Sequence, residues 1–252
     1  MLHDERCIRC GACAAACPNG AVTLEDGAPV TDRSTCRVCG TCADACWADA
    51  RQLAGRAMTA EQVLAAVERD RPFYERSSGG LTLSGGEPLR QPEFAAELLA
   101  AAHARGLHTA LDTCGHAAWA VLDAVRRDVD LFLFDLKLAD PARHRRCTGV
   151  GNETILANLR RLAEGGHRIV LRCPVVPGIT DDDDNLAGLR AIASGLPQLE
   201  RIELLPYHGA GAGKYRRLAR NYRLPRTEAP TPRRMSDIAS FLAAGGLTVG
   251  GG

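Results

Sequence analysis

The sequence predicts an α/β fold in which a small cysteine-rich module precedes a larger region built around a parallel sheet or barrel. From residue 56 onward, apolar strand-like runs alternate with amphipathic helical stretches. Alternation at this spacing is typical of βαβ units, which form parallel sheets and barrels. Eight of the eleven cysteines fall between Cys7 and Cys46. We therefore expect two domains, residues 1–55 and residues 56–252.

The expected elements of the second domain are read from apolar patterns and from helix start signals. Apolar runs predict strands over 81–84, 108–112, 131–136, 168–173, 201–206 and 247–250. Amphipathic patterns predict helices over 60–70, 92–105, 117–128, 152–164, 183–194 and 232–244. Thr59 is a suitable N-cap for the first helix, with Gln62 at the capping-box position. The acidic run at 181–184 is expected to begin a helix, and residues 209–231 predict a long loop.

Composition and charge exclude several classes of function. The net charge of +1 gives no reason to expect a nucleic-acid partner. No apolar run reaches the roughly 18 residues that a membrane span needs. The charged start MLHDERC lacks the apolar stretch of a signal peptide. We therefore expect a cytoplasmic protein with no membrane partner, in which dense cysteine indicates metal rather than disulfides.

Two cysteine runs in the first domain share the spacing C-x2-C-x2-C-x3-C. This pattern is typical of bacterial ferredoxins with two [4Fe–4S] clusters, in which the fourth cysteine of each run binds the other cluster. A structural zinc site takes only four ligands, so zinc or disulfides explain the eight cysteines less well. The module therefore predicts electron transfer. The expected ligand sets are Cys7, Cys10, Cys13 and Cys46 for one cluster, and Cys36, Cys39, Cys42 and Cys17 for the other.

Polar or glycine-bearing motifs follow five consecutive strands of the second domain. They are SGGEP (84–88), DTCG (112–115), DLK (135–137), PVVPG (174–178, after a strand ending at Cys173) and LPYH (205–208). Each alone could be a turn, a helix cap or a surface residue. In parallel α/β barrels, however, the active site lies at the carboxyl ends of the strands. Their occurrence in order therefore predicts a functional site there.

The chain resembles the glycyl-radical-enzyme activating proteins, and the segment that carries this resemblance most clearly is DRPFYERSSGGLTLSGGEPLRQPEF (70–94). These proteins are radical-SAM relatives of pyruvate formate-lyase activating enzyme. The similarity continues through LHTALDTCGH, LFLFDLKLADPARHRRCTGVGNETILANL, RCPVVPGITDDDDN and LPYHGAGAGKYRRL, and it covers essentially the whole chain. The chain looks like the subgroup with a ferredoxin insert. The resemblance implies a partial (β/α)6 radical-SAM barrel that lacks its first strand.

The resemblance also implies an oxidoreductase activity and the residues that serve it. In the family, one electron from a reduced cluster cleaves S-adenosylmethionine, and the resulting 5′-deoxyadenosyl radical removes hydrogen from a glycine of a partner glycyl radical enzyme. A flavodoxin or ferredoxin is the implied electron donor. The residues that match S-adenosylmethionine-binding positions are Gly85, Gly86 and Glu87 for the ammonium, Asp112 and Thr113 beside the methionine, Asp135 and Lys137 for ribose and carboxylate, and His208 near the same ligand.

The chain departs from the family at its catalytic cluster. The family holds this third [4Fe–4S] cluster on a C-x3-C-x2-C motif before the ferredoxin insert, and this sequence contains no such motif. The remaining cysteines, Cys114, Cys147 and Cys173, are dispersed. No catalytic residue is therefore identified, and the third cluster is expected only in a full-length form. A misassigned start codon or a gene fragment is the favoured explanation over a genuine variant. The alternative function is a two-cluster electron carrier or a degenerate, non-catalytic protein.

Overall fold

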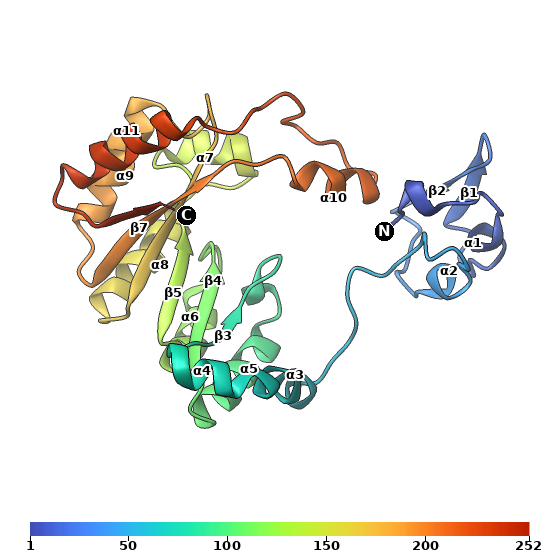
Figure 1. The fold of residues 1–252 in the computed structure, drawn as a ribbon, viewed down its shortest axis with the longest axis horizontal. Coiled ribbons are helices and arrows are strands. Elements are labelled where there is room, and N and C mark those ends of the chain that lie inside the picture. Colours follow the sequence, from blue (N-terminus) through green and yellow to red (C-terminus); the bar gives the residue numbers. More distant parts are fainter. Residues whose placement is uncertain (252) are drawn as a thin grey trace. The chain divides into compact units, whose positions relative to one another are not determined.

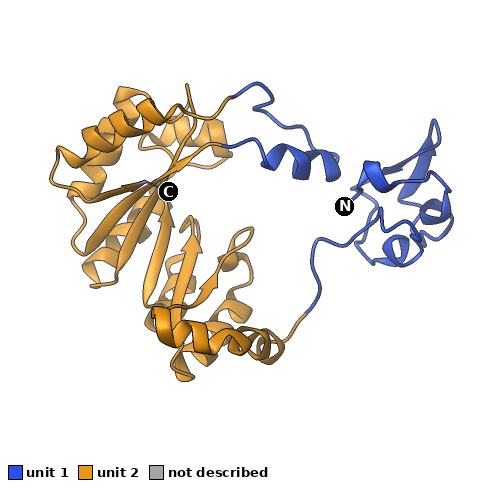
Figure 2. Cartoon of the chain, in the orientation of Figure 1, with its two compact units in different colours: residues 1–57, 208–227 blue, residues 58–207, 228–252 orange. Residues whose placement is uncertain are grey.

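The computed structural model describes residues 1–251 and divides them into two units (Figures 1 and 2). Unit 1 comprises residues 1–57 and 208–227, and unit 2 comprises residues 58–207 and 228–252. Within the described residues, no helix is long and apolar enough to cross a membrane.

Unit 1 is built from very short elements between its cysteines. They are the 3-10 helix η1 (Asp4–Arg6), α1 (Ala12–Ala15), β1 (Val22–Glu25), β2 (Ala28–Thr31), α2 (Thr41–Asp44) and α10 (Gly211–Arg217). Strands β1 and β2 form an antiparallel hairpin around Asp26 and Gly27, both at positive φ. An Asp-Gly pair in this conformation is a favoured tight hairpin turn. Helix α10 lies within the segment 209–231 that was expected to be a loop, so that expectation was wrong for residues 211–217.

Unit 2 contains a six-stranded parallel sheet in the sequential order β3-β4-β5-β6-β7-β8. The strands are β3 (Gly80–Leu83), β4 (His108–Thr113), β5 (Leu131–Asp135), β6 (Ile169–Val175), β7 (Leu199–Pro206) and β8 (Val249–Gly251). All six coincide with predicted strands to within two residues. Because neighbouring strands are parallel and consecutive, their carboxyl ends share one edge of the sheet.

The helices of unit 2 follow the outer side of this curved sheet (Figure 1). The α-helices are α3 (Ala60–Val67), α4 (Arg71–Ser77), α5 (Pro92–Ala104), α6 (Trp119–Val125), α7 (Pro141–Thr148), α8 (Glu153–Glu164), α9 (Asp183–Ser194) and α11 (Pro232–Ala243), and the 3-10 helices are η2 (Glu68–Asp70), η3 (Pro88–Arg90) and η4 (Arg126–Asp128). The predicted capping box is confirmed, because Thr59 and Gln62 exchange side-chain and backbone hydrogen bonds at the start of α3. The acidic run does begin a helix, with Asp182 as the N-cap of α9.

Apolar side chains of the sheet and helices form one large core in unit 2. Phe132 and Phe134 of β5 are fully buried in it, as are Leu159 and Leu162 of α8. A smaller cluster around Leu64 packs α3 against α5. This core fixes the strands, and through them it positions the polar groups at the strand ends.

Strand β6 is longer than the sequence suggested, since it continues through Pro174 to Val175 rather than ending at Cys173. Proline has no N–H to donate to a neighbouring strand and is normally confined to sheet edges. Here β5 ends opposite Arg172, so one side of β6 has no strand partner at Pro174. The missing N–H therefore costs no ladder hydrogen bond, and β6 extends its carboxyl end beyond that of β5.

Candidate functional site

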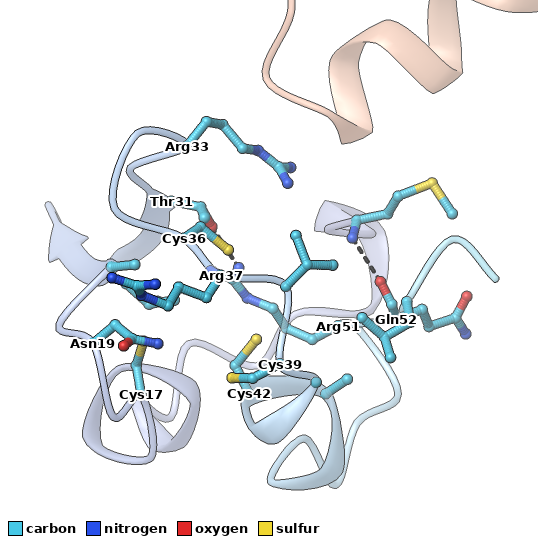
Figure 3. Close-up of a pocket in the computed structure, with 17 residues that line it drawn as sticks. Cys17, Asn19, Thr31, Arg33, Cys36, Arg37, Cys39, Cys42, Arg51 and Gln52 are labelled. Carbon is cyan, nitrogen blue, oxygen red and sulfur yellow. Dashed lines mark hydrogen bonds between the residues drawn. The ribbon is translucent and has the colours of Figure 1, made fainter. Parts of the chain in front are cut away.

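Unit 1 gathers its eight cysteines around two pockets. Cys17, Cys36, Cys39 and Cys42 lie in the wall of the pocket shown in Figure 3. A second pocket is lined by the other set, Cys7, Cys10, Cys13 and Cys46. In each set the fourth cysteine of one run joins the first three of the other. These are the two sets that the sequence assigned to separate [4Fe–4S] clusters.

The two cysteine runs have the same unusual backbone conformation. Arg9 and Val38, which precede the second cysteine of each run, both have positive φ, at 56° and 53°. Gly11 and Gly40, which follow that cysteine, also have positive φ, at 77° and 91°. A β-branched residue such as Val38 strongly disfavours this region. Backbone that alternates between right- and left-handed turns forms an anion-binding concavity that is common at iron–sulfur sites. The backbone therefore fits a cluster.

The cysteines of the pocket in Figure 3 differ in electrostatic environment. A hydrogen bond with the Thr41 hydroxyl, 3.4 Å from Sγ, lowers the pKa of Cys39. Burial raises the pKa of Cys42, and the positive charge of Arg51 opposes that effect. In residues 1–251 no three His, Cys, Asp or Glu side chains converge as they would on a single metal ion. A cubane binds one thiolate at each iron, so its four ligands need not converge on one atom.

In unit 2, polar and charged side chains from four consecutive strands meet toward the carboxyl edge of the sheet. Ser84 donates a hydrogen bond to Asp112, with 2.7 Å between Oγ and Oδ2. Lys137 Nζ lies 3.1 Å from Asp135 Oδ2. Arg172 lies between the two aspartates, with Nη1 2.8 Å from Asp112 and Nε 3.5 Å from Asp135. This edge therefore carries an alternating set of acidic and basic groups.

Arg172 was not predicted as a site residue. It interrupts the apolar pattern of β6 and is only 21% exposed in its side chain. Its neighbours in space come from β4 and β5, more than thirty residues earlier in the chain. A charged residue within an otherwise buried strand is the one signal in the sequence that could have identified it.

The Glu87 carboxylate fixes the loop that follows β3. It accepts hydrogen bonds from the Thr113 hydroxyl at 2.7 Å, from the Cys114 N–H at 3.0 Å and from the Leu89 N–H at 3.2 Å. These bonds tie the SGGEP and DTCG segments together. Gly85 has a φ of 131°, and a Cβ at Gly85 or Gly86 would meet no described atom within 4 Å. The glycine backbone is therefore open to a ligand, and the Glu87 carboxylate makes three hydrogen bonds to its own and the neighbouring loop.

Three buried asparagine side chains, none of them predicted as a site residue, hold the loops after β4 and β5. Asn158 donates to the carbonyl oxygens of Gly115 and Ala117. Asn152 donates to the carbonyl oxygens of Leu138 and Ala139. Asn185 accepts from the Ala139 N–H at 2.9 Å. Each asparagine lies at or near the start of a helix or on its buried face, where an amide is unusual, and that was the available signal.

The other predicted residues are placed as follows. Thr113 is buried beside Glu87, while His208 belongs to unit 1. Cys114 is half-buried, and burial and the nearby Glu87 raise its pKa. Cys147 is exposed on α7, whereas Cys173 is buried in β6, where burial raises its pKa to about 12.

Comparison with known proteins places these features in context. Residues 34–189 match the family model described as "Radical SAM superfamily", and residues 2–23 match "4Fe-4S binding domain". The chain is 43% identical over 230 residues to the choline trimethylamine-lyase activating enzyme of Oleidesulfovibrio alaskensis, covering 88% of this chain and 74% of that protein. It is also 43% identical over 232 residues to the (2S)-3-sulfopropanediol sulfolyase activating enzyme of Bilophila wadsworthia, covering 90% and 76%.

A solved structure is similar as well. A domain of a pyruvate-formate lyase-activating enzyme from Bacteroides vulgatus matches with a TM-score of 0.59 and 32% sequence identity. The match covers 69% of this chain and 99% of that one.

Proposed function

Because this chain belongs to the radical SAM superfamily and, within it, to the activating enzymes of glycyl radical enzymes, we propose that its two units divide the work of activation. Unit 1 carries electrons, and unit 2 binds S-adenosylmethionine. The chain is a radical SAM oxidoreductase whose protein partner is a glycyl radical enzyme.

The observation that carries this proposal is the polar edge of the unit 2 sheet. S-adenosylmethionine presents an ammonium, a carboxylate, ribose hydroxyls and a sulfonium. The open backbone of Gly85 and Gly86 suits the ammonium. Glu87 holds this loop in place by accepting a hydrogen bond from the Thr113 hydroxyl. Asp135 supplies a carboxylate that suits a ribose hydroxyl, and its Oδ1 makes no hydrogen bond within the described residues, although Arg172 Nε lies 3.5 Å away.

The remaining groups at this edge complete the proposed binding site. Lys137 supplies a positive charge for the ligand carboxylate. Arg172 keeps Asp112 and Asp135 oriented by pairing with both. We include His208 in the site on the sequence resemblance.

We propose that unit 1 holds two [4Fe–4S] clusters, with the ligand sets that line its two pockets. The clusters supply one-electron transfer when bound. The chain's own residues place four thiolates around each pocket and turn the backbone at Gly11 and Gly40. We take residues 1–55 as this ferredoxin-like module and residues 56–252 as the radical-SAM part, whose six strands form a partial barrel without its first strand.

The ligand assignment is tested by exchanging the fourth cysteines. In a background variant with Cys36, Cys39 and Cys42 replaced by Ala, one cluster of about four irons should remain. Adding Cys17→Ala should leave that iron content unchanged, whereas adding Cys46→Ala should abolish it. The reverse result would show that each run binds its own cluster.

Cleavage of S-adenosylmethionine requires a third cluster on a C-x3-C-x2-C motif, which the 252 residues do not contain. We therefore propose that this chain as written binds S-adenosylmethionine without cleaving it, and that a form which includes the motif is the active enzyme. The test compares both forms under anaerobic reduction with S-adenosylmethionine and a glycyl radical enzyme. Only the longer form should give 5′-deoxyadenosine and a glycyl radical signal in electron paramagnetic resonance (EPR).

A second candidate function is electron transfer alone. The paired cysteine pockets and the absence of a C-x3-C-x2-C motif from the 252 residues favour it. It predicts reversible one-electron reduction of unit 1 and no binding of S-adenosylmethionine to unit 2. Isothermal titration calorimetry separates the two functions, because binding of S-adenosylmethionine that is lost in an Asp135→Ala variant supports the activating enzyme.

We further propose a flavodoxin or ferredoxin as electron donor. We also propose a cytoplasmic location, because a chain whose dense cysteines bind metal rather than form disulfides suits a reducing compartment.

A further inference from the structure

Arg51 is a buried cation that touches both cysteine pockets of unit 1. Arg51 lines the pocket of Cys17, Cys36, Cys39 and Cys42 and also the pocket of Cys7, Cys10, Cys13 and Cys46. Only 6% of the residue is exposed. Figure 3 shows the side chain extending across the first pocket toward the side that carries Cys36 and Thr31. No other charged residue lines both pockets among the described residues.

Two of the three guanidinium nitrogens of Arg51 are unpartnered. Nη1 donates to the Thr31 hydroxyl at 2.5 Å. Nε and Nη2 are buried, and no described residue offers either of them an acceptor. A guanidinium does not lose its proton in a protein, so this is a buried charge with free donors. Such a charge costs several kcal/mol unless an anion meets it.

The backbone holds Arg51 firmly in this position. Arg51 forms an antiparallel bridge with Leu2. On either side of it, the His3 N–H donates to Ala50 and the Gln52 N–H donates to Met1, at 2.8 and 3.0 Å. The preceding residue, Ala50, is also buried, at 1% exposure. These bonds fix the Arg51 backbone, and the bond from Nη1 to Thr31 orients its side chain before any ligand binds.

We propose that Arg51 is a shared electrostatic partner of both [4Fe–4S] clusters and raises the reduction potential of each. This inference rests on the proposed clusters. A cubane with four thiolates is an anion, and its negative charge grows by one on reduction. Hydrogen bonds to sulfur and nearby positive charge both favour the reduced form. The free Nε and Nη2 donors supply both effects, in surroundings that water screens poorly.

The test is an EPR-monitored redox titration of the anaerobically reconstituted full chain and of Arg51→Met. Methionine keeps much of the apolar stem but removes the charge and the donors. Both clusters should become harder to reduce, each by at least tenfold in the reduction equilibrium, which is about 59 mV for a one-electron couple. Unchanged potentials would overturn the proposal, and so would a shift in one cluster alone.

Matched controls come from arginines that line one pocket only. Arg37 lines the first pocket and Arg9 the second, and both are exposed. Arg37→Met and Arg9→Met should change the potentials far less than Arg51→Met. Arg51→Lys keeps the charge with different donors and should restore part of the shift. If a control variant matches Arg51→Met, general surface charge explains the effect and the shared role is wrong.

Iron content separates failure of this inference from failure of the cluster proposal. A wild-type chain that folds but holds no cubane contradicts the clusters themselves. A wild-type chain and an Arg51→Met variant that each hold about eight irons, with equal potentials, contradict only the role of Arg51. If Arg51→Met loses its iron, Arg51→Lys decides. Retention of the clusters in Arg51→Lys supports the electrostatic role, and loss in both variants indicates that Arg51 is structural.

Discussion

Gly115 of the DTCG motif is the position where a single methyl group should damage both the core and the proposed ligand site. Its φ is 66°, in the left-handed region, and an added Cβ would overlap Phe134 Cζ and lie 2.6 Å from Cε2. Phe134 is fully buried and cannot move aside. The left-handed conformation costs a non-glycine residue about 1–2 kcal/mol. Overpacking a core adds about 1–3 kcal/mol, so Gly115→Ala should lower the free energy of unfolding by about 2–5 kcal/mol.

The matched control is Gly106→Ala. Gly106 has a similar φ of 70°, but its Cβ would meet no described atom within 4 Å. It should cost only the conformational part, about 1–2 kcal/mol. Urea unfolding monitored by circular dichroism measures both variants. Equal midpoints for the two would refute the proposed clash with Phe134.

Gly115→Ala should also weaken binding of S-adenosylmethionine more than the control does. The Gly115 N–H donates to the Thr113 hydroxyl at 3.0 Å, and that hydroxyl donates to Glu87. A displaced Gly115 therefore disturbs the carboxylate that holds the SGGEP loop. Isothermal titration calorimetry on the two alanine variants gives the comparison, and equal affinities would contradict this coupling.

Two further predictions concern titratable groups of unit 2. Hydrogen bonds from Arg143 lower the pKa of Asp182 from its ordinary 3.8 to about 2, so this stabilisation is complete above pH 3.8 and is lost as the pH falls toward 2. Arg143→Met should therefore lower the free energy of unfolding by about 1 kcal/mol at pH 7 and by less at pH 3; the value is small because solvent screens the partly exposed pair. A difference in urea midpoint that does not change with pH would contradict this. Iodoacetamide at pH 8 should label the exposed Cys147 in the folded chain, whereas the buried Cys173, whose pKa is about 12, should be labelled only after denaturation. Equal labelling rates by mass spectrometry would contradict the burial of Cys173.

Local signals in the sequence predicted the elements of unit 2 well. Each strand is a short apolar run, and each long helix has one apolar face, so both patterns are readable without tertiary information. The capping box at Thr59 is equally local. Helix α7 was missed although Asp140 and Pro141 are standard start signals, because its RHRR sequence has almost no apolar face. Helix α10 contains two glycines within seven residues, which disfavours a helix in isolation.

The residues that complete the two sites were harder to predict, because their partners are distant in the chain. The role of Arg172 depends on Asp112 and Asp135, which lie beside it only because their strands pair in the sheet. Arg51 lies outside both cysteine runs in the sequence, and the fold of unit 1 brings it to the wall of both cysteine pockets. The cysteines themselves were predictable because cluster ligation requires a fixed short spacing.

The central claim is that the two cysteine sets of unit 1 hold [4Fe–4S] clusters that serve radical SAM chemistry. Iron and sulfide analysis of the anaerobically reconstituted 252-residue chain, combined with EPR after dithionite reduction, tests it most directly. The account predicts about eight irons and eight sulfides per chain and the spectrum of two reduced cubanes that interact magnetically. A folded chain that binds zinc instead, or that gives no cubane signal, would contradict it.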